Sequence, residues 1–111
     1  MIFHHSIGFP SNFRRPIGNF YTKPSRHAIA RAQEKRIDIP RIINLSDFDI
    51  IELEITNGRI AKMVIRGEYD NYDDICMAVH FDRGSLFIRT VWLNDINDTH
   101  HTLDASKYGR P

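Results

Sequence analysis

Residues 51–58 have the sequence Ile-Glu-Leu-Glu-Ile-Thr-Asn-Gly, and this stretch decides the fold that we expect. Its apolar residues, Ile51, Leu53 and Ile55, alternate with polar ones, which is the two-residue period of a strand with one buried face. The closing Asn-Gly pair tolerates the positive φ angles of a type I′ turn. The stretch therefore predicts the first hairpin of an antiparallel sheet.

The alternation continues after this turn and predicts three more strands. The inward positions of the second and third strands are expected at Ala61, Met63, Ile65, Ile75, Met77, Val79 and Phe81. Asp82-Arg83-Gly84 predicts another turn, and residues 86–93 form a last strand that is apolar on both faces. Together, residues 48–93 are expected to form a four-stranded antiparallel β-meander.

A helix is expected before the meander. Residues 26–36 are good helix formers without a β-branched cluster, and Ser25 is a suitable N-cap. Asp38-Ile39-Pro40 suggests a second cap, with the proline in the first turn of a short helix through Ile43. Residues 25–44 are thus predicted to be helical. The predicted class is α+β, with a short N-terminal helix or two packed on the meander.

The two ends of the chain show no regular period. Three prolines and two glycines interrupt residues 1–24, which predicts an irregular arm pinned by its aromatic side chains. Residues 94–111 are expected to be a C-terminal tail, in which Tyr108 is a candidate for stacking on a base or part of a frayed end. Because 111 residues suit one core, we expect a single domain over 1–111.

Composition excludes several classes of protein. No stretch of about 18 apolar residues predicts a membrane helix, and residues 1–10 do not resemble a signal peptide. Cys76 is the only cysteine, which excludes an internal disulfide framework and a CxxC metal site. These features predict a cytoplasmic protein that does not enter a membrane.

Charge is distributed unevenly along the chain. Residues 1–46 contain eight Lys/Arg against two Asp/Glu, a net charge of +6, whereas residues 47–111 have a net charge of −5. A basic half is suited to contact a phosphate backbone. The alternative is that the two halves attract each other within one fold, and the sequence leaves both interpretations open.

One face of the predicted helix carries groups that suit RNA cleavage. His27, Arg31 and Glu34 follow each other at i, i+4 and i+7 and so share that face. A histidine near neutral pH can take the proton of a 2′-OH, and a guanidinium can stabilise the charged phosphorane. A solvated polar face with an incidental histidine is the alternative explanation for these three residues.

Three stretches of the sequence, the predicted helix among them, resemble motifs of known proteins. Residues 24–38 have the sequence Pro-Ser-Arg-His-Ala-Ile-Ala-Arg-Ala-Gln-Glu-Lys-Arg-Ile-Asp, which resembles the S-x-H-x-x-x-R-A-x-x-x-x-I-D helix of the RegB endoribonucleases. Leu-Glu-Ile-Thr-Asn-Gly at 53–58 is similar to their L-E-I-T-D-G turn, and Ile-Arg-Thr-Val-Trp at 88–92 is similar to the last strand of allied domains. The chain thus resembles the superfamily of RelE/YoeB/RegB-like small endoribonucleases, which includes phage enzymes and toxins.

The resemblance implies a RelE-like sheet and RNA hydrolysis without a metal or other cofactor. His27 matches a catalytic histidine and Arg31 its neighbouring arginine. With them we assign Arg89 as a second phosphate stabiliser and Thr90 as a positioning hydroxyl, and three residues that hold the RNA backbone: Arg26, Lys35 and Arg36. RegB proteins have a second catalytic histidine at a position near Asp47, where this chain has none, although His80 could replace it in space.

Two functions follow from these observations. The first is a metal-independent endoribonuclease, phage- or toxin-like, whose partner would be RNA, with a ribosome or an antitoxin as further candidates. The second is a non-catalytic binding module of the same fold that binds a host protein or RNA and modulates its activity. The retained His27–Arg31 pair favours the first, and the missing second histidine favours the second.

The remaining candidates are weaker. His4-His5 and His100-His101 are poorly spaced for a shared metal. The acidic residues of the loop 70–74 lack the frame of a calcium loop, and we expect a solvated turn there.

Overall fold

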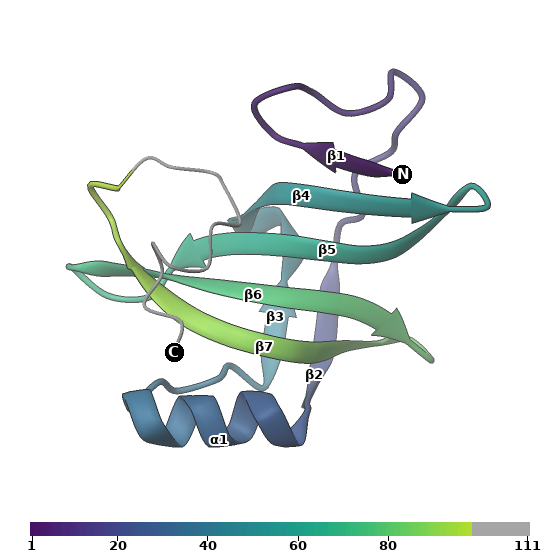
Figure 1. The fold of residues 1–111 in the computed structure, drawn as a ribbon. Helices are drawn as coiled ribbons and strands as arrows, with labels where there is room; N and C mark the ends of the chain where they lie inside the picture. Colours follow the sequence, from purple (N-terminus) through teal and green to yellow (C-terminus); the bar gives the residue numbers. More distant parts are fainter. Residues whose placement is uncertain (99–111) are drawn as a thin grey trace.

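A computed structural model describes residues 1–98, which form seven strands and one α-helix (Figure 1). The elements are β1 (Ile2–His4), β2 (Asn19–Pro24), α1 (Arg26–Lys35), β3 (Ile42–Asn44), the 3₁₀ helix η1 (Leu45–Asp47), β4 (Phe48–Thr56), β5 (Arg59–Glu68), β6 (Asp73–Asp82) and β7 (Ser85–Asp95). The predicted tail 94–111 therefore begins inside β7, and its residues 99–111, with Tyr108, lie outside the described part.

The strands form one mixed sheet in the order β1-β4-β5-β6-β7-β2-β3. All neighbouring pairs are antiparallel except β7 and β2, which are parallel. The predicted class, one or two helices on a four-stranded antiparallel meander, is therefore wrong. The four expected strands are present as β4–β7, but they are the middle of a larger sheet.

Two tight turns connect strands of the meander. Asn57 and Gly58 have φ angles of 53° and 74° at the β4–β5 turn. Arg83 and Gly84 have φ angles of 50° and 82° at the β6–β7 turn. Consecutive positive φ angles suit the right-handed twist of an antiparallel hairpin, so the Asn-Gly pair forms the hairpin turn expected from the sequence.

Two regions differ from the predictions for local reasons. The arm 1–24 is not irregular throughout, because β1 pairs with β4 and β2 pairs with β7 and β3. The predicted helical region 25–44 ends its α-helix at Lys35, and Ile42–Asn44 is a strand. Pro40 does not start a helix; its carbonyl accepts a hydrogen bond from Thr22 Oγ1 at 2.6 Å.

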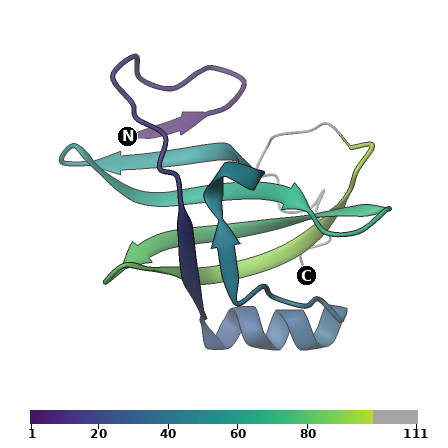
Figure 2. The ribbon, with the colours of Figure 1, turned by 180° about the vertical axis from the view of Figure 1, so that it is seen from behind.

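The core lies on one face of the meander. β2 and β3 run across the direction of β4–β7 behind that face, so the sheet curls over the core (Figures 1 and 2). The meander contributes Leu53, Met63, Met77 and Val79, each 0% exposed, as expected from their alternation. Ala28 and Ala32 of α1 belong to the same buried cluster as Ile43 of β3.

Helix α1 packs along β7 and lies below the meander in the view of Figure 1. Its small buried residues, Ala28 and Ala32, allow this close approach.

Within the described residues, no helix is long and apolar enough to span a membrane.

Candidate functional site

Ser25 fixes the start of α1 against β7. Its side-chain oxygen accepts a hydrogen bond from the backbone N–H of Ala28 at 3.0 Å, which caps the helix. The same hydroxyl donates to the carbonyl of Arg89 at 2.9 Å, and the Ser25 N–H donates to the carbonyl of Ile88 at 2.9 Å. The first turn of the helix is therefore held next to residues 88–89.

An irregularity in β7 explains how one serine reaches two successive carbonyls. Ala78 of β6 pairs with Thr90, and Val79 pairs with Ile88, so Arg89 is an extra residue without a partner on β6. Such a β-bulge bends the strand and changes the direction of its groups, and bulges are common next to active sites. This bulge presents Arg89 at the point where α1 begins.

Replacing Ser25 by alanine should reduce the free energy of unfolding by about 1–2 kcal/mol. The range is the usual cost of losing a side-chain N-cap, and its upper end is expected because the bond to Arg89 is lost as well. Thermal denaturation followed by circular dichroism measures the change. Ser25→Thr retains the hydroxyl and is the control; a Ser25→Ala protein that melts with the unchanged one would contradict this role.

His27, Arg31 and Lys35 share one flank of α1 because they are spaced four residues apart. His27 and Lys35 are exposed. Arg31 lies beside the buried Ala28 and Ala32 and is only 7% exposed. The flank therefore combines a solvent-accessible imidazole with a guanidinium that is largely enclosed by the protein.

Arg31 has no counter-charge in the described part of the chain. Among residues 1–98, no side chain or carbonyl forms a hydrogen bond or ion pair with its guanidinium. The other buried arginine is different: Arg66 donates from Nε to Asp74 Oδ2 at 2.7 Å and from Nη2 to the Asp95 carbonyl at 3.1 Å. A buried cation without a partner costs free energy that a bound anion would recover.

Arg89 and Thr90 complete the group of predicted catalytic residues. Arg89 is exposed at the bulge, and Thr90 is half-buried. Within residues 1–98, no hydrogen bond or ion pair joins His27, Arg31, Arg89 and Thr90 to one another. The contacts of Ser25 hold the start of α1 next to residues 88–89, so His27 follows this junction two residues later along α1, and Thr90 follows it directly along β7.

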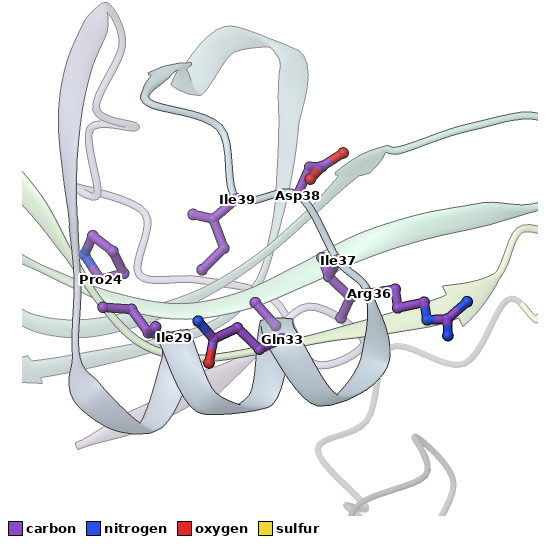
Figure 3. Close-up of a pocket in the computed structure, with 8 residues that line it drawn as sticks. Pro24, Ile29, Gln33, Arg36, Ile37, Asp38 and Ile39 are labelled. Atoms are coloured by element: carbon purple, nitrogen blue, oxygen red, sulfur yellow. The ribbon is translucent and has the colours of Figure 1, made fainter.

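Arg36 is not brought to this junction. It is the C-cap of α1, with a left-handed φ of 56°, and it lines a groove on the opposite flank of the helix (Figure 3). The groove has a volume of about 610 Å³ and is lined by Pro24, Ile29, Ala32, Gln33, Arg36, Ile37, Asp38 and Ile39. Arg26 is exposed at the first position of the helix and does not share the flank of His27.

The position near Asp47, where RegB proteins have their second histidine, lies at the end of η1, between β3 and β4. Asp47 lines a separate groove together with Asp38, and this groove contains none of the predicted catalytic residues. His80 instead lies on β6, the neighbour of β7, and its ring stacks on Phe87. The alternation of β6 indicated its outward face, but the pairing with Phe87 depends on a register that the sequence does not show.

Other polar clusters have local explanations. Burial raises the pKa of the Cys76 thiol to about 12, so it stays protonated near neutral pH and is a poor nucleophile. Asp70 Oδ1 accepts hydrogen bonds from the N–H groups of Tyr72 and Asp73 at 2.8 and 2.7 Å, which closes the expected turn. Among residues 1–98, no three His, Cys, Asp or Glu side chains gather in a group that could hold a metal ion; His100-His101 lies outside this range.

Comparison with known proteins adds no relative from which function could be transferred. No protein-family model matches this chain, and no curated protein or solved structure matches it significantly.

Proposed function

We propose that this chain is a metal-independent endoribonuclease of the RelE/YoeB/RegB-like type, with its active site where α1 meets the bulge of β7. The observation that carries the proposal is Arg31, a guanidinium that is 7% exposed and has no anionic partner within residues 1–98. A phosphate of the RNA backbone would supply the missing charge. Arginine suits this role because its planar fork of donors matches phosphate oxygens.

The neighbouring residues fit a transphosphorylation in which the phosphoryl group moves from the 5′-oxygen to the 2′-oxygen. His27 would take the proton of the 2′-OH as its oxygen attacks the adjacent phosphorus. The bond from phosphorus to the 5′-oxygen breaks, and that oxygen leaves with a proton from an acid or from water. Arg31 and Arg89 would stabilise the charge that develops on the phosphorane, and the Thr90 hydroxyl would position the phosphate.

The charges of the first half support a nucleic-acid partner. Of the eight Lys/Arg in residues 1–46, only Lys23 forms an ion pair with a described residue, to Asp82 at 3.9 Å. Close ion pairs with described residues therefore neutralise only one of these eight cations. We assign Arg26 and Lys35 to the RNA backbone and leave out Arg36, which lies on the other flank of α1.

Incubating the purified protein with single-stranded cellular RNA in excess EDTA tests the proposal. We expect cleavage that leaves a 2′,3′-cyclic phosphate and a 5′-hydroxyl, because the 2′-oxygen is the nucleophile. The same sequence with a 2′-deoxy sugar at the cut site should resist cleavage. Cleavage that stops in EDTA, or that still occurs at a 2′-deoxy site, would refute this mechanism.

A non-catalytic binding module is the second candidate. Its support is the absence of a histidine near Asp47 together with the groove beside α1, whose isoleucines could receive an apolar side chain of a partner (Figure 3). A protein that binds RNA tightly but cuts none of it would favour this candidate. Binding should weaken as salt is added. A plot of the logarithm of the association constant against the logarithm of the salt concentration should have a slope of roughly −0.7 for each phosphate neutralised on a single strand.

A further inference from the structure

A row of side chains crosses three strands on the face of the sheet opposite the core. Phe87 of β7 pairs with Lys23 of β2 on one side and with His80 of β6 on the other. Paired residues of neighbouring strands point to the same face. Their chain neighbours Leu86 and Val79 are 0% exposed in the core, so the row faces outward.

The two rings of this row are already stacked. The centroids of His80 and Phe87 lie 4.9 Å apart, and their planes differ by 28°. Both residues are half-buried, so part of each ring is accessible. A third flat ring could therefore be added to the end of an ordered stack without ordering the first two.

Two cationic residues are neighbours of Phe87 in the sheet. Lys23 is next to it across the strand pair, and Arg89 follows two residues later along β7, roughly 7 Å away at the usual rise of a strand. Asp82 is a nearby carboxylate, and it pairs with Lys23 at 3.9 Å. An aromatic surface bordered by cations suits a nucleotide, which has a flat base and a negative phosphate a comparable distance apart.

We propose that Phe87 and His80 form a stacking site for one unpaired base of the RNA, next to the phosphate that Arg31 and Arg89 bind. This inference rests on the proposed function, because the phosphate sets where the base lies. The site would select single-stranded RNA, since a base within a duplex cannot leave its stack without a cost in free energy. It would have little preference among bases, because each has a flat aromatic face.

A cycle of protein and RNA changes tests this site. The protein change is Phe87→Leu, which keeps an apolar side chain but removes the ring, in a His27→Ala background so that bound RNA is not cut. The probes are a mixed-sequence single strand of about ten nucleotides and copies of it, each with one abasic nucleotide. Dissociation constants are measured for every pair, and thermal denaturation confirms that each variant is folded.

We expect an abasic nucleotide at one position to weaken RNA binding by about 5- to 100-fold in the His27→Ala protein that retains Phe87. Phe87→Leu should bind the intact RNA more weakly by a similar factor and should be insensitive to the abasic change at that position. Phe13→Leu is the matched control, since it removes a half-buried ring that packs against Phe9 in the N-terminal segment. Phe13→Leu should respond to abasic nucleotides as the protein that retains both Phe13 and Phe87 does.

Three outcomes would overturn the inference. If Phe87→Leu weakens binding equally for all copies, the ring only stabilises the sheet. If cleavage is observed but Phe87→Leu binds normally, the stacking site is wrong and the endoribonuclease proposal stands. If no RNA binds even at low salt, both proposals fail. Should Phe87→Leu not fold, His80→Asn takes its place with the same expectations.

Discussion

A protein with His27 replaced by alanine should cleave RNA more slowly by on the order of 10²–10⁴, the usual contribution of a positioned acid or base. His27 is exposed on the flank of α1 that also carries Arg31, so its imidazole can reach a phosphate bound there. Because it makes no hydrogen bond to another residue of 1–98, removing it should leave stability nearly unchanged. Initial rates with a fixed RNA measure the loss.

Gln33→Ala is the matched control for His27→Ala. Gln33 is exposed on the same helix but lines the groove on the opposite flank (Figure 3). Its replacement should leave the cleavage rate within about twofold, since exposed substitutions away from a site are usually close to neutral. If His27→Ala cuts as fast as the unchanged protein while its circular dichroism is normal, His27 is not the acid or base.

Arg31 and Arg66 should respond in opposite ways when each is replaced by methionine. For Arg31→Met we expect the cleavage rate to fall by about 10²–10³, because a charge that stabilises the phosphorane is lost. The free energy of unfolding should stay the same or rise, since an unpaired, 7% exposed cation is replaced by an apolar chain of similar length.

Arg66→Met removes a cation that is paired. Asp74 would lose its 2.7 Å partner, and the Asp95 carbonyl would lose a donor. We expect the free energy of unfolding to fall by about 2–4 kcal/mol, somewhat less than is usual for a fully buried pair, because the side chain of Asp74 is 23% exposed. Chemical denaturation of both variants gives the comparison.

The comparison separates a functional arginine from a structural one. Reduced cleavage with full stability in Arg31→Met would show that this arginine is held for a ligand. A fall in stability for Arg31→Met as large as that for Arg66→Met would contradict the proposal, since it would mean that the guanidinium makes interactions that stabilise the fold.

The sequence predicted the elements whose signals are local. The helix depends on Ser25 and the alanines after it, and the β4–β5 turn depends on the tolerance of Asn57 and Gly58 for positive φ angles. Alternation also identified the buried face of the meander, where Leu53 and Met77 are 0% exposed. Each of these features is decided by residues within a few positions of one another.

The missed elements depend on partners far away in the chain. β2 contains Pro24, which lacks an N–H, yet it joins the sheet because the proline is the last residue of the strand and the last that pairs with β7. Pro40 resembles a helix start, but the following residues pair with β2 instead. For the candidate site, the spacing of His27 and Arg31 indicated a shared flank, whereas the bulge at Arg89 and the opposite position of Arg36 required the three-dimensional register.

The parallel pairing of β2 with β7 also determines when the proposed site can form during translation. Ser25 is synthesised 64 residues before Arg89, whose carbonyl it binds. At typical rates of translation that interval lasts roughly 3–13 s. Throughout it, α1 lacks β7, the strand along which it packs, and the proposed catalytic residues cannot meet. If the proposed function is correct, a ribosome must therefore synthesise at least residues 1–89 before this chain can cut any RNA, including its own message.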